Sequence, residues 1–211
     1  MSILDELKKT KHKVLVIDDG SEYNFETLST IDRSDWKLLS NPFNGGKEKF
    51  WERWLEALSG FKESNEEYVL FLPDDVSNIQ IDKIDNLCNQ GWDDYLFAVN
   101  VLNDGRENCW GEFSLGQIEI NIDKVKYREV GFVDCGFLSN RNTMSKINID
   151  EVPKSWFNRS DKSSGVGYQL TTKMRELGVR MMTPDKSLAY HGDHDSVMHP
   201  EERKNNPLIS K

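Results

Sequence analysis

Several features are scarce or missing in this sequence, and each absence narrows the class of protein. No apolar run approaches the ~20 residues that a membrane-spanning helix needs. The first residues lack the basic and apolar regions of a secretory signal peptide. Only three cysteines are present, Cys88, Cys109 and Cys135, and their odd number and spacing fit no metal-binding motif. We therefore expect a cytoplasmic protein with reduced thiols.

Basic residues are also fewer than acidic ones. The chain of 211 residues has 27 Lys and Arg against 36 Asp and Glu, a net charge of −9. Because general nucleic-acid binding relies on Lys and Arg to neutralise phosphates, this balance disfavours it, although a local basic groove stays open. No repeat, low-complexity tract or linker divides the chain. We expect one domain over residues 1–211, with a nucleotide half at 12–102, an acceptor half at 103–197 and a polar tail at 198–211.

Strand and helix patterns alternate along the chain, which is typical of an α/β fold with a mostly parallel central sheet. The uniformly apolar segment 68–72 is expected to be a central strand, buried on both faces. Gly178 is expected to end a late helix. The predicted strands are residues 12–18, 36–39, 68–72, 95–102, 118–122, 130–138, 179–182 and 187–190, of which 118–122 and 130–138 are expected to form a β-ribbon. The predicted helices are residues 47–61, 79–87 and 165–177.

Three clusters of acidic residues or histidines follow predicted strands. They are Asp18-Asp19-Gly20-Ser21, Asp74-Asp75 and His191-Gly192-Asp193-His194. In an open α/β sheet, ligands bind just beyond the carboxyl ends of the strands, so these clusters are expected to share one site. Carboxylate and imidazole groups can hold a divalent cation and the phosphates that it bridges. The pattern therefore predicts nucleotide-sugar chemistry.

Each cluster also has a simpler interpretation. Pro-Asp-Asp is good turn chemistry, and Ser21 could cap a helix. In the functional interpretation, a carboxylate at Asp18 accepts the imide N–H of a uracil ring. A cation would compensate the costly carboxylate pair Asp74-Asp75. Arg203 and Lys204, on the polar tail, would meet a diphosphate.

The tryptophans divide into two groups. Trp51 and Trp54 recur at helical spacing and are expected in the core. Trp92, Trp110 and Trp156 lie in irregular segments, where one of them could stack on a sugar or a base.

Taken in order, these motifs resemble the family 2-like glycosyltransferases with the GT-A fold. The segment VLVIDDGS (14–21) is similar to their nucleotide-binding strand, and NGGKEKFWERWLEAL (44–58) to the Gly-Gly helix that follows it. YVLFLPDDV (68–76) resembles the strand with the DxD-type metal motif. GFVDCGFLSNR (131–141) is similar to the acceptor-side strand, and LAYHGDH (188–194) to the segment with a late metal-binding histidine.

The resemblance implies that Asp18 or Asp19 contacts the nucleobase. It also implies that Asp75, helped by Asp74, holds Mn²⁺ or Mg²⁺ and that His191 completes the metal shell. The candidate nucleotide-binding residues are Asp18, Asp19, Gly20, Lys47, Asp74 and Arg203. The candidate metal ligands are Asp75, His191 and His194.

One departure from the family pattern concerns the general base. Inverting members have an acidic pair at the start of the late helix, where this chain has Val166-Gly167. Either Asp134, Asp161 or Asp193 takes that role, or the enzyme retains the anomeric configuration. Asp134 and Asp161 are the candidate catalytic residues.

We therefore expect a metal-dependent glycosyltransferase that moves a sugar from a nucleoside-diphosphate donor, a UDP-sugar, to an acceptor hydroxyl. A glycan, a protein, a small molecule or a modified nucleobase in viral DNA remain open as acceptors. One alternative is a nucleotidyltransferase acting on sugar phosphates, although the Gly-rich loop of such enzymes is not evident after the first strand. The other is a non-catalytic module that binds nucleotide sugars.

Overall fold

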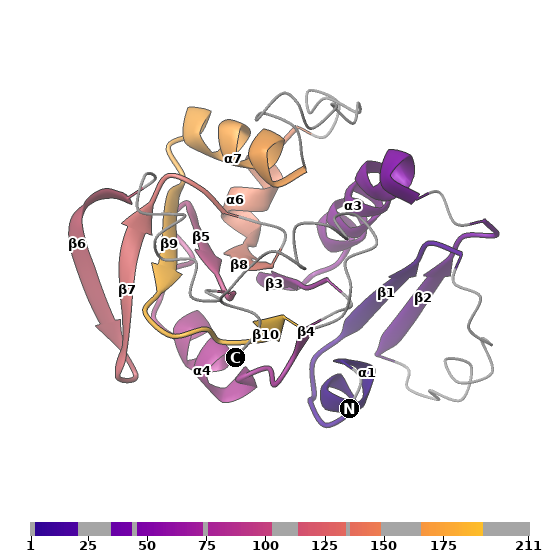
Figure 1. The fold of residues 1–211 in the computed structure, drawn as a ribbon, viewed down its shortest axis with the longest axis horizontal. Helices are drawn as coiled ribbons and strands as arrows, with labels where there is room; N and C mark the ends of the chain where they lie inside the picture. Colours follow the sequence, from indigo (N-terminus) through magenta and orange to yellow (C-terminus); the bar gives the residue numbers. More distant parts are fainter. Residues whose placement is uncertain are drawn as a thin grey trace, which may run out of the picture.

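The computed structural model describes residues 3–20, 35–43, 46–73, 76–102, 114–133, 136–148 and 166–191 (Figure 1). It confirms a mixed α/β architecture. The helices are α1 (Ile3–Leu7), α3 (Gly46–Glu63), α4 (Ile81–Cys88), α6 (Arg141–Lys146) and α7 (Val166–Glu176). The strands are β1 (Val14–Asp18), β2 (Trp36–Ser40), β3 (Tyr68–Phe71), β4 (Val76–Ser77), β5 (Phe97–Asn100), β6 (Ser114–Ile122), β7 (Val125–Val130), β8 (Phe137–Asn140), β9 (Arg180–Pro184) and β10 (Tyr190–His191).

The largest sheet has six strands in the order β3-β8-β5-β9-β7-β6. Only β5 and β9 pair in parallel, whereas the other neighbours in this sheet are antiparallel. The expectation of a mostly parallel central sheet is therefore wrong for these pairings. The physical reason is that β8 lies between β3 and β5, and β7 lies between β9 and β6, each running against its neighbours. Strands β1 and β2 form a separate parallel pair, and β4 and β10 form a short antiparallel pair.

Strand β3 lies at the edge of the six-stranded sheet, so its expected central position is also wrong. Phe71 is buried, whereas Tyr68, Val69 and Leu70 are partly exposed. An apolar run does not distinguish a central strand from an edge strand that is covered by a helix, and α3 covers β3 here. Trp54 of α3 stacks on Phe71 with a centroid separation of 4.8 Å.

The predicted β-ribbon exists, but its strands differ from those expected. β6 pairs with β7, and residues 131–136 separate β7 from β8, so residues 130–138 are not one strand. Asp123 and Lys124 form the turn of the ribbon with φ values of 49° and 64°. Both residues adopt the left-handed region that hairpin turns use, where Asn-Gly is the familiar sequence signal. Because Lys is a poor signal for this turn, the sequence did not reveal where β7 begins.

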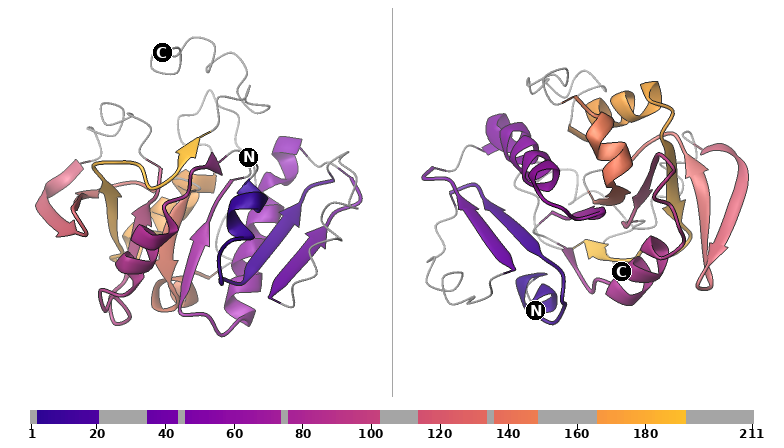
Figure 2. Two further views of the ribbon diagram at one scale, coloured as in Figure 1. Left: turned by 90° about the horizontal axis from the view of Figure 1, so that it is seen from below. Right: turned by 180° about the vertical axis from the view of Figure 1, so that it is seen from behind.

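Helices cover both faces of the six-stranded sheet, and each face has its own hydrophobic core (Figure 2). The core beneath α3, α6 and α7 includes Trp54, Phe71, Phe137, Met144, Leu170 and Met174. The core beneath α4 includes Ile84, Leu87, Phe97, Tyr127 and Leu188. The expected core position of Trp54 is thus confirmed. Within the described ranges, no helix has the length and apolar character that crossing a bilayer requires.

Candidate functional site

The carboxyl ends of β1 and β3 lie beside the same part of α3. Arg53 Nε donates a hydrogen bond to Asp19 Oδ1 at 2.8 Å, and the next residue, Trp54, stacks on Phe71. Farther along α3, Gly60 faces Leu15, where an added Cβ would lie 2.5 Å from the Leu15 Cδ2 atom. Both strands therefore run antiparallel to α3. An ion pair between Lys13, just before β1, and Glu66, just before β3, joins their other ends.

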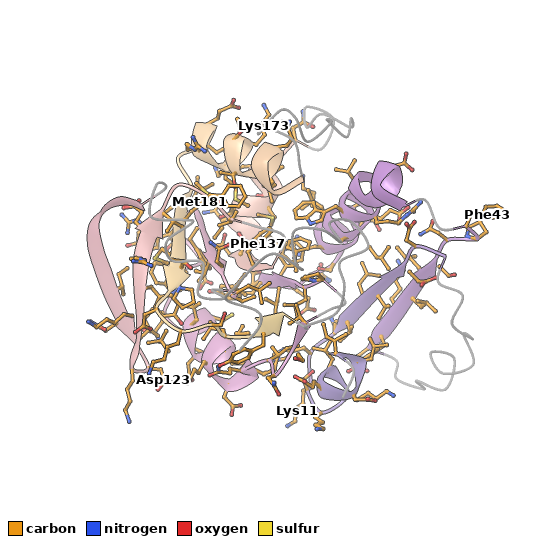
Figure 3. The ribbon with its side chains drawn as sticks, viewed as in Figure 1. Lys11, Phe43, Asp123, Phe137, Lys173 and Met181 are labelled. Atoms are coloured by element: carbon orange, nitrogen blue, oxygen red, sulfur yellow. The ribbon has the colours of Figure 1, made fainter. Side chains whose placement is uncertain are left out.

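The end of β5 and the start of β8 reach the same region as the end of β3. Val101 N donates to the Gly136 carbonyl oxygen at 3.0 Å. A Cβ placed on Gly136 would lie 2.6 Å from Leu102 Cδ1 and 3.8 Å from Pro73 Cδ. Phe137, the first residue of β8, lies in this region, between the sheet and the helices α3 and α7 (Figure 3).

The short pair β4–β10 brings the late part of the chain to the segment that follows β3. His191 is the register partner of Val76, and Tyr190 is the partner of Ser77. The main-chain amides of Leu188 and Ala189 donate to the Val101 carbonyl at 2.8 and 3.2 Å, which ties the approach to β10 to the end of β5. The backbone of His191 therefore lies beside the residue that follows Asp75 in the chain.

The structure describes only part of the predicted site. Asp18, Asp19 and Gly20 are described in full, and for Lys47 and His191 the backbone alone is described. The remaining candidates lie outside the described residues: Asp74, Asp75, Asp134, Asp161, Asp193, His194, Arg203 and Lys204, together with Trp110 and Trp156. Among the residues that are described, no group of three or more His, Cys, Asp or Glu is arranged to hold a metal ion.

Asp18 and Gly20 form a tight turn at the end of β1. Gly20 N donates to Asp18 Oδ2 at 3.1 Å, and Gly20 has a φ of 73°, a left-handed conformation that glycine adopts without strain. Asn41, which follows β2, donates from its main-chain and side-chain nitrogens to the Asp18 carbonyl at 3.0 and 2.9 Å. Asp18–Gly20 is therefore a hydrogen-bonded turn, and the residue after β2 fixes it in place.

Arg53 is a central residue of this end of the molecule that the sequence analysis missed. Its side chain is only 16% exposed and also donates through Nη1 to Asn41 Oδ1 at 2.6 Å and Glu56 Oε1 at 2.5 Å. Burial lowers its pKa, but the hydrogen bonds to Glu56 and Asp19 outweigh burial, so the pKa of the guanidinium is raised overall. No sequence signal marks Arg53, because its partners come from three separate elements.

Several of the described carboxylates lie close to this arginine. Arg53 faces Asp19 and Glu56 directly, and a Glu52 oxygen lies 4.0 Å from its Nη2. The second carboxylate oxygen of Glu56 is buried without a hydrogen-bond partner among the described residues. Asp18 adds another carboxylate next to Asp19. The structure therefore describes four carboxylates in this region.

Helix α7 fixes the chain just before Asp134. The Thr171 hydroxyl accepts a hydrogen bond from Val133 N and donates one to the Val133 carbonyl, both at 3.0 Å, and Thr171 is fully buried. Arg175 adds a hydrogen bond to the Gly131 carbonyl at 3.2 Å. This clamp was also missed, because a threonine inside a helix carries no signal for a partner 38 residues away.

The structure describes Trp92, one of the three tryptophans considered for stacking on a ligand, and the exposed Phe43. The ring of Trp92 packs against Phe97 at 5.4 Å and Tyr95 at 6.2 Å between centroids. Phe43, in the loop after β2, is 81% exposed and projects away from the body of the protein (Figure 3).

Comparison of the chain with protein-family models and with curated proteins gives no match.

Proposed function

We propose that this protein is a metal-dependent glycosyltransferase with a nucleoside-diphosphate sugar donor and a GT-A-like arrangement of its domain. The observation that carries the proposal is that two of the predicted polar segments lie near the end of β3 or beside the residues that follow it. The Asp18–Gly20 turn lies beside α3 near the end of β3, and β10 pairs His191 with the residue that follows Asp75. This is where ligands bind in open α/β sheets.

The donor side would use the acidic character of this region. A carboxylate at Asp18 or Asp19 would accept the uracil imide N–H, and Arg53 and Asn41 would keep the turn that presents it. Asp75, with Asp74, His191 and His194, would hold Mn²⁺ or Mg²⁺. A cation would offset the repulsion between these carboxylates and the donor diphosphate. When bound, the metal supplies Lewis-acid stabilisation of the departing diphosphate oxygen.

The acceptor side would use a carboxylate to take the proton from the attacking hydroxyl. Asp134 is favoured over Asp161, because Thr171 fixes the adjacent Val133 through two buried hydrogen bonds. A product that keeps the anomeric configuration of the donor would instead indicate a retaining reaction. Cytoplasmic localisation is part of the proposal, as the sequence predicts.

Release of nucleoside diphosphate from a panel of nucleotide sugars, with Mn²⁺ or with EDTA, tests the proposal. A glycosyltransferase should release UDP slowly by hydrolysing its donor, and only with metal present. A binding module should be stabilised thermally by the donor but release no UDP. A nucleotidyltransferase should instead release pyrophosphate from a nucleoside triphosphate and a sugar phosphate.

The base preference is tested in the same panel by thermal stability. A ligand present at a hundredfold excess over its Kd stabilises the folded state by about 2.7 kcal/mol. If Asp18 reads uracil, UDP binds more tightly than ADP or GDP, so at equal concentrations UDP should raise the Tm more than they do. Equal shifts for all three would count against Asp18 as a reader of uracil.

A further inference from the structure

One carboxylate of helix α1, that of Glu6, accepts hydrogen bonds from two successive main-chain amides. Glu6 Oε1 accepts the main-chain N–H of Asn78, and Glu6 Oε2 accepts that of Ile79, both at 2.8 Å. Asn78 has a φ of 51°, in the left-handed region that few residues other than glycine adopt. Such a conformation turns successive amides toward one anion. Both oxygens of Glu6 are thus used on the two residues that directly follow β4.

The same short segment is fixed from its other side by the chain that leads into β10. Gln80 N donates to the Leu188 carbonyl at 2.8 Å, and Gln80 Nε2 donates to the Ser187 carbonyl at 2.9 Å. Residues 76–80 therefore lie between α1 and residues 187–191. Loss of the contact on either side would free β4 to shift against β10.

The other described contacts around α1 involve partly exposed side chains. No residue of α1 is buried, and an open groove of about 800 Å³ separates residues 9–12 from α4. His12 Nε2 lies 3.1 Å from Asp85 Oδ1 across this groove, with side chains that are 51% and 43% exposed. Exposed pairs of this kind contribute little to stability. Among the described polar contacts, the dual hydrogen bond of Glu6 is thus the one that joins α1 to the residues directly after β4.

We infer that Glu6 is a positioning residue of the proposed metal and donor site. By fixing the amides of Asn78 and Ile79, it keeps β4 in the register that places His191 beside Val76. The inference rests on the proposed function, since it assigns Glu6 an effect on metal-dependent binding of the donor diphosphate.

The test compares Glu6→Ala and Glu6→Gln with Asp5→Ala. Asp5 is on the same helix, 52% exposed, and lies 3.7 Å from Lys8, so its removal controls for general effects on α1. Amide hydrogen exchange of the ligand-free protein reports on Asn78, Ile79 and the β4–β10 pair. Calorimetry with UDP, in Mn²⁺ and in EDTA, reports on the site.

Glu6→Ala is expected to speed exchange at Asn78, Ile79 and β10. It should weaken Mn²⁺-dependent UDP binding about 10–100-fold, as supporting residues of metal sites do, and leave the affinity in EDTA unchanged. Glu6→Gln should be intermediate, because its amide oxygen accepts and its amide nitrogen does not. Asp5→Ala should match the original protein in both measurements.

Faster exchange in Glu6→Ala with unchanged Mn²⁺-dependent affinity would overturn the inference and leave Glu6 a purely structural role. Unchanged exchange at β10 would overturn it as well. If the original protein itself shows no Mn²⁺-dependent UDP binding, the proposed function fails and the role of Glu6 toward the metal fails with it. Should Glu6→Ala not fold, the Glu6→Gln variant decides between the same outcomes.

Discussion

Arg53 and Asp19 form an ion pair of 2.8 Å that connects α3 to the turn after β1. The same guanidinium bonds to Asn41, whose side chain in turn donates to the Asp18 carbonyl. Three elements that are distant in the sequence are thus connected through one side chain at the proposed nucleotide site.

Arg53→Met should lower the free energy of unfolding by about 1–3 kcal/mol, because it leaves partly buried carboxylates without their cation. It should also weaken UDP binding, since the Asp18–Gly20 turn loses its support. Arg53→Lys keeps the charge but not the planar fork, so an intermediate loss is expected. Urea unfolding and calorimetry check both effects, with the exposed Arg180→Met as control. Unchanged stability in Arg53→Met would contradict this role.

Gly136→Ala should destabilise the protein by about 1–3 kcal/mol, because the new methyl group overpacks a tight contact. Its Cβ would lie 2.6 Å from Leu102 Cδ1 and 3.0 Å from Leu102 Cγ. If that clash is the cause, the added change Leu102→Ala should cost less in the Gly136→Ala background than alone. Thermal unfolding of the two single variants and the double variant measures this coupling, and purely additive effects would refute the packing explanation.

Thr171→Val should cost about 1–3 kcal/mol of stability, because it leaves the buried amide and carbonyl of Val133 unpaired at nearly unchanged side-chain volume. If Asp134 is the general base, turnover should also fall while UDP affinity stays the same. Thr171→Ser retains the hydroxyl and should restore both properties. Full turnover in Thr171→Val would show that the hydrogen bonds between Thr171 and Val133 are not needed for catalysis.

Stability should decline at alkaline pH. Burial raises the pKa of the Tyr127 phenol from 10.0 to about 12, and that of the Cys88 thiol from 9.0 to about 12. The unfolded chain loses these protons at lower pH than the folded protein does. The stabilising contribution is therefore complete below about pH 9 and is lost progressively as pH rises toward 12.

Urea unfolding at about pH 8 and about pH 10.5 measures this decline. The double variant Tyr127→Phe and Cys88→Ala should show a flatter pH profile. An equally steep decline in that variant would assign the alkaline loss to other groups.

The spacing of apolar residues and glycines in the sequence correctly predicted several helices and strands. The helical spacing around Trp54 and Leu58 predicted α3, and Gly178 ends the helical turn after α7 with a φ of 70°, as expected. Strands β1, β2, β5 and β9 were also predicted within a few residues. The direction and order of the strands were not, because pairing is a long-range choice that an apolar run does not encode.

The candidate site was predictable to a similar degree. The Asp18–Gly20 turn follows from its composition, and the backbone of His191 pairs with Val76, the residue after Asp75. Arg53, Thr171 and Glu6 were missed. Each acts through partners from other elements, and no spacing in the sequence announces such a partner.

The central claim is that Asp75 holds the metal that a nucleoside diphosphate needs in order to bind. Calorimetry of UDP with Mn²⁺ and with EDTA, on the original protein, Asp75→Asn and the exposed control Asp94→Asn, tests it most directly. Mn²⁺ should strengthen UDP binding in the original protein and in Asp94→Asn. Asp75→Asn should lose this Mn²⁺-dependent gain in affinity. UDP binding to Asp75→Asn with unchanged affinity and unchanged metal dependence would contradict the account.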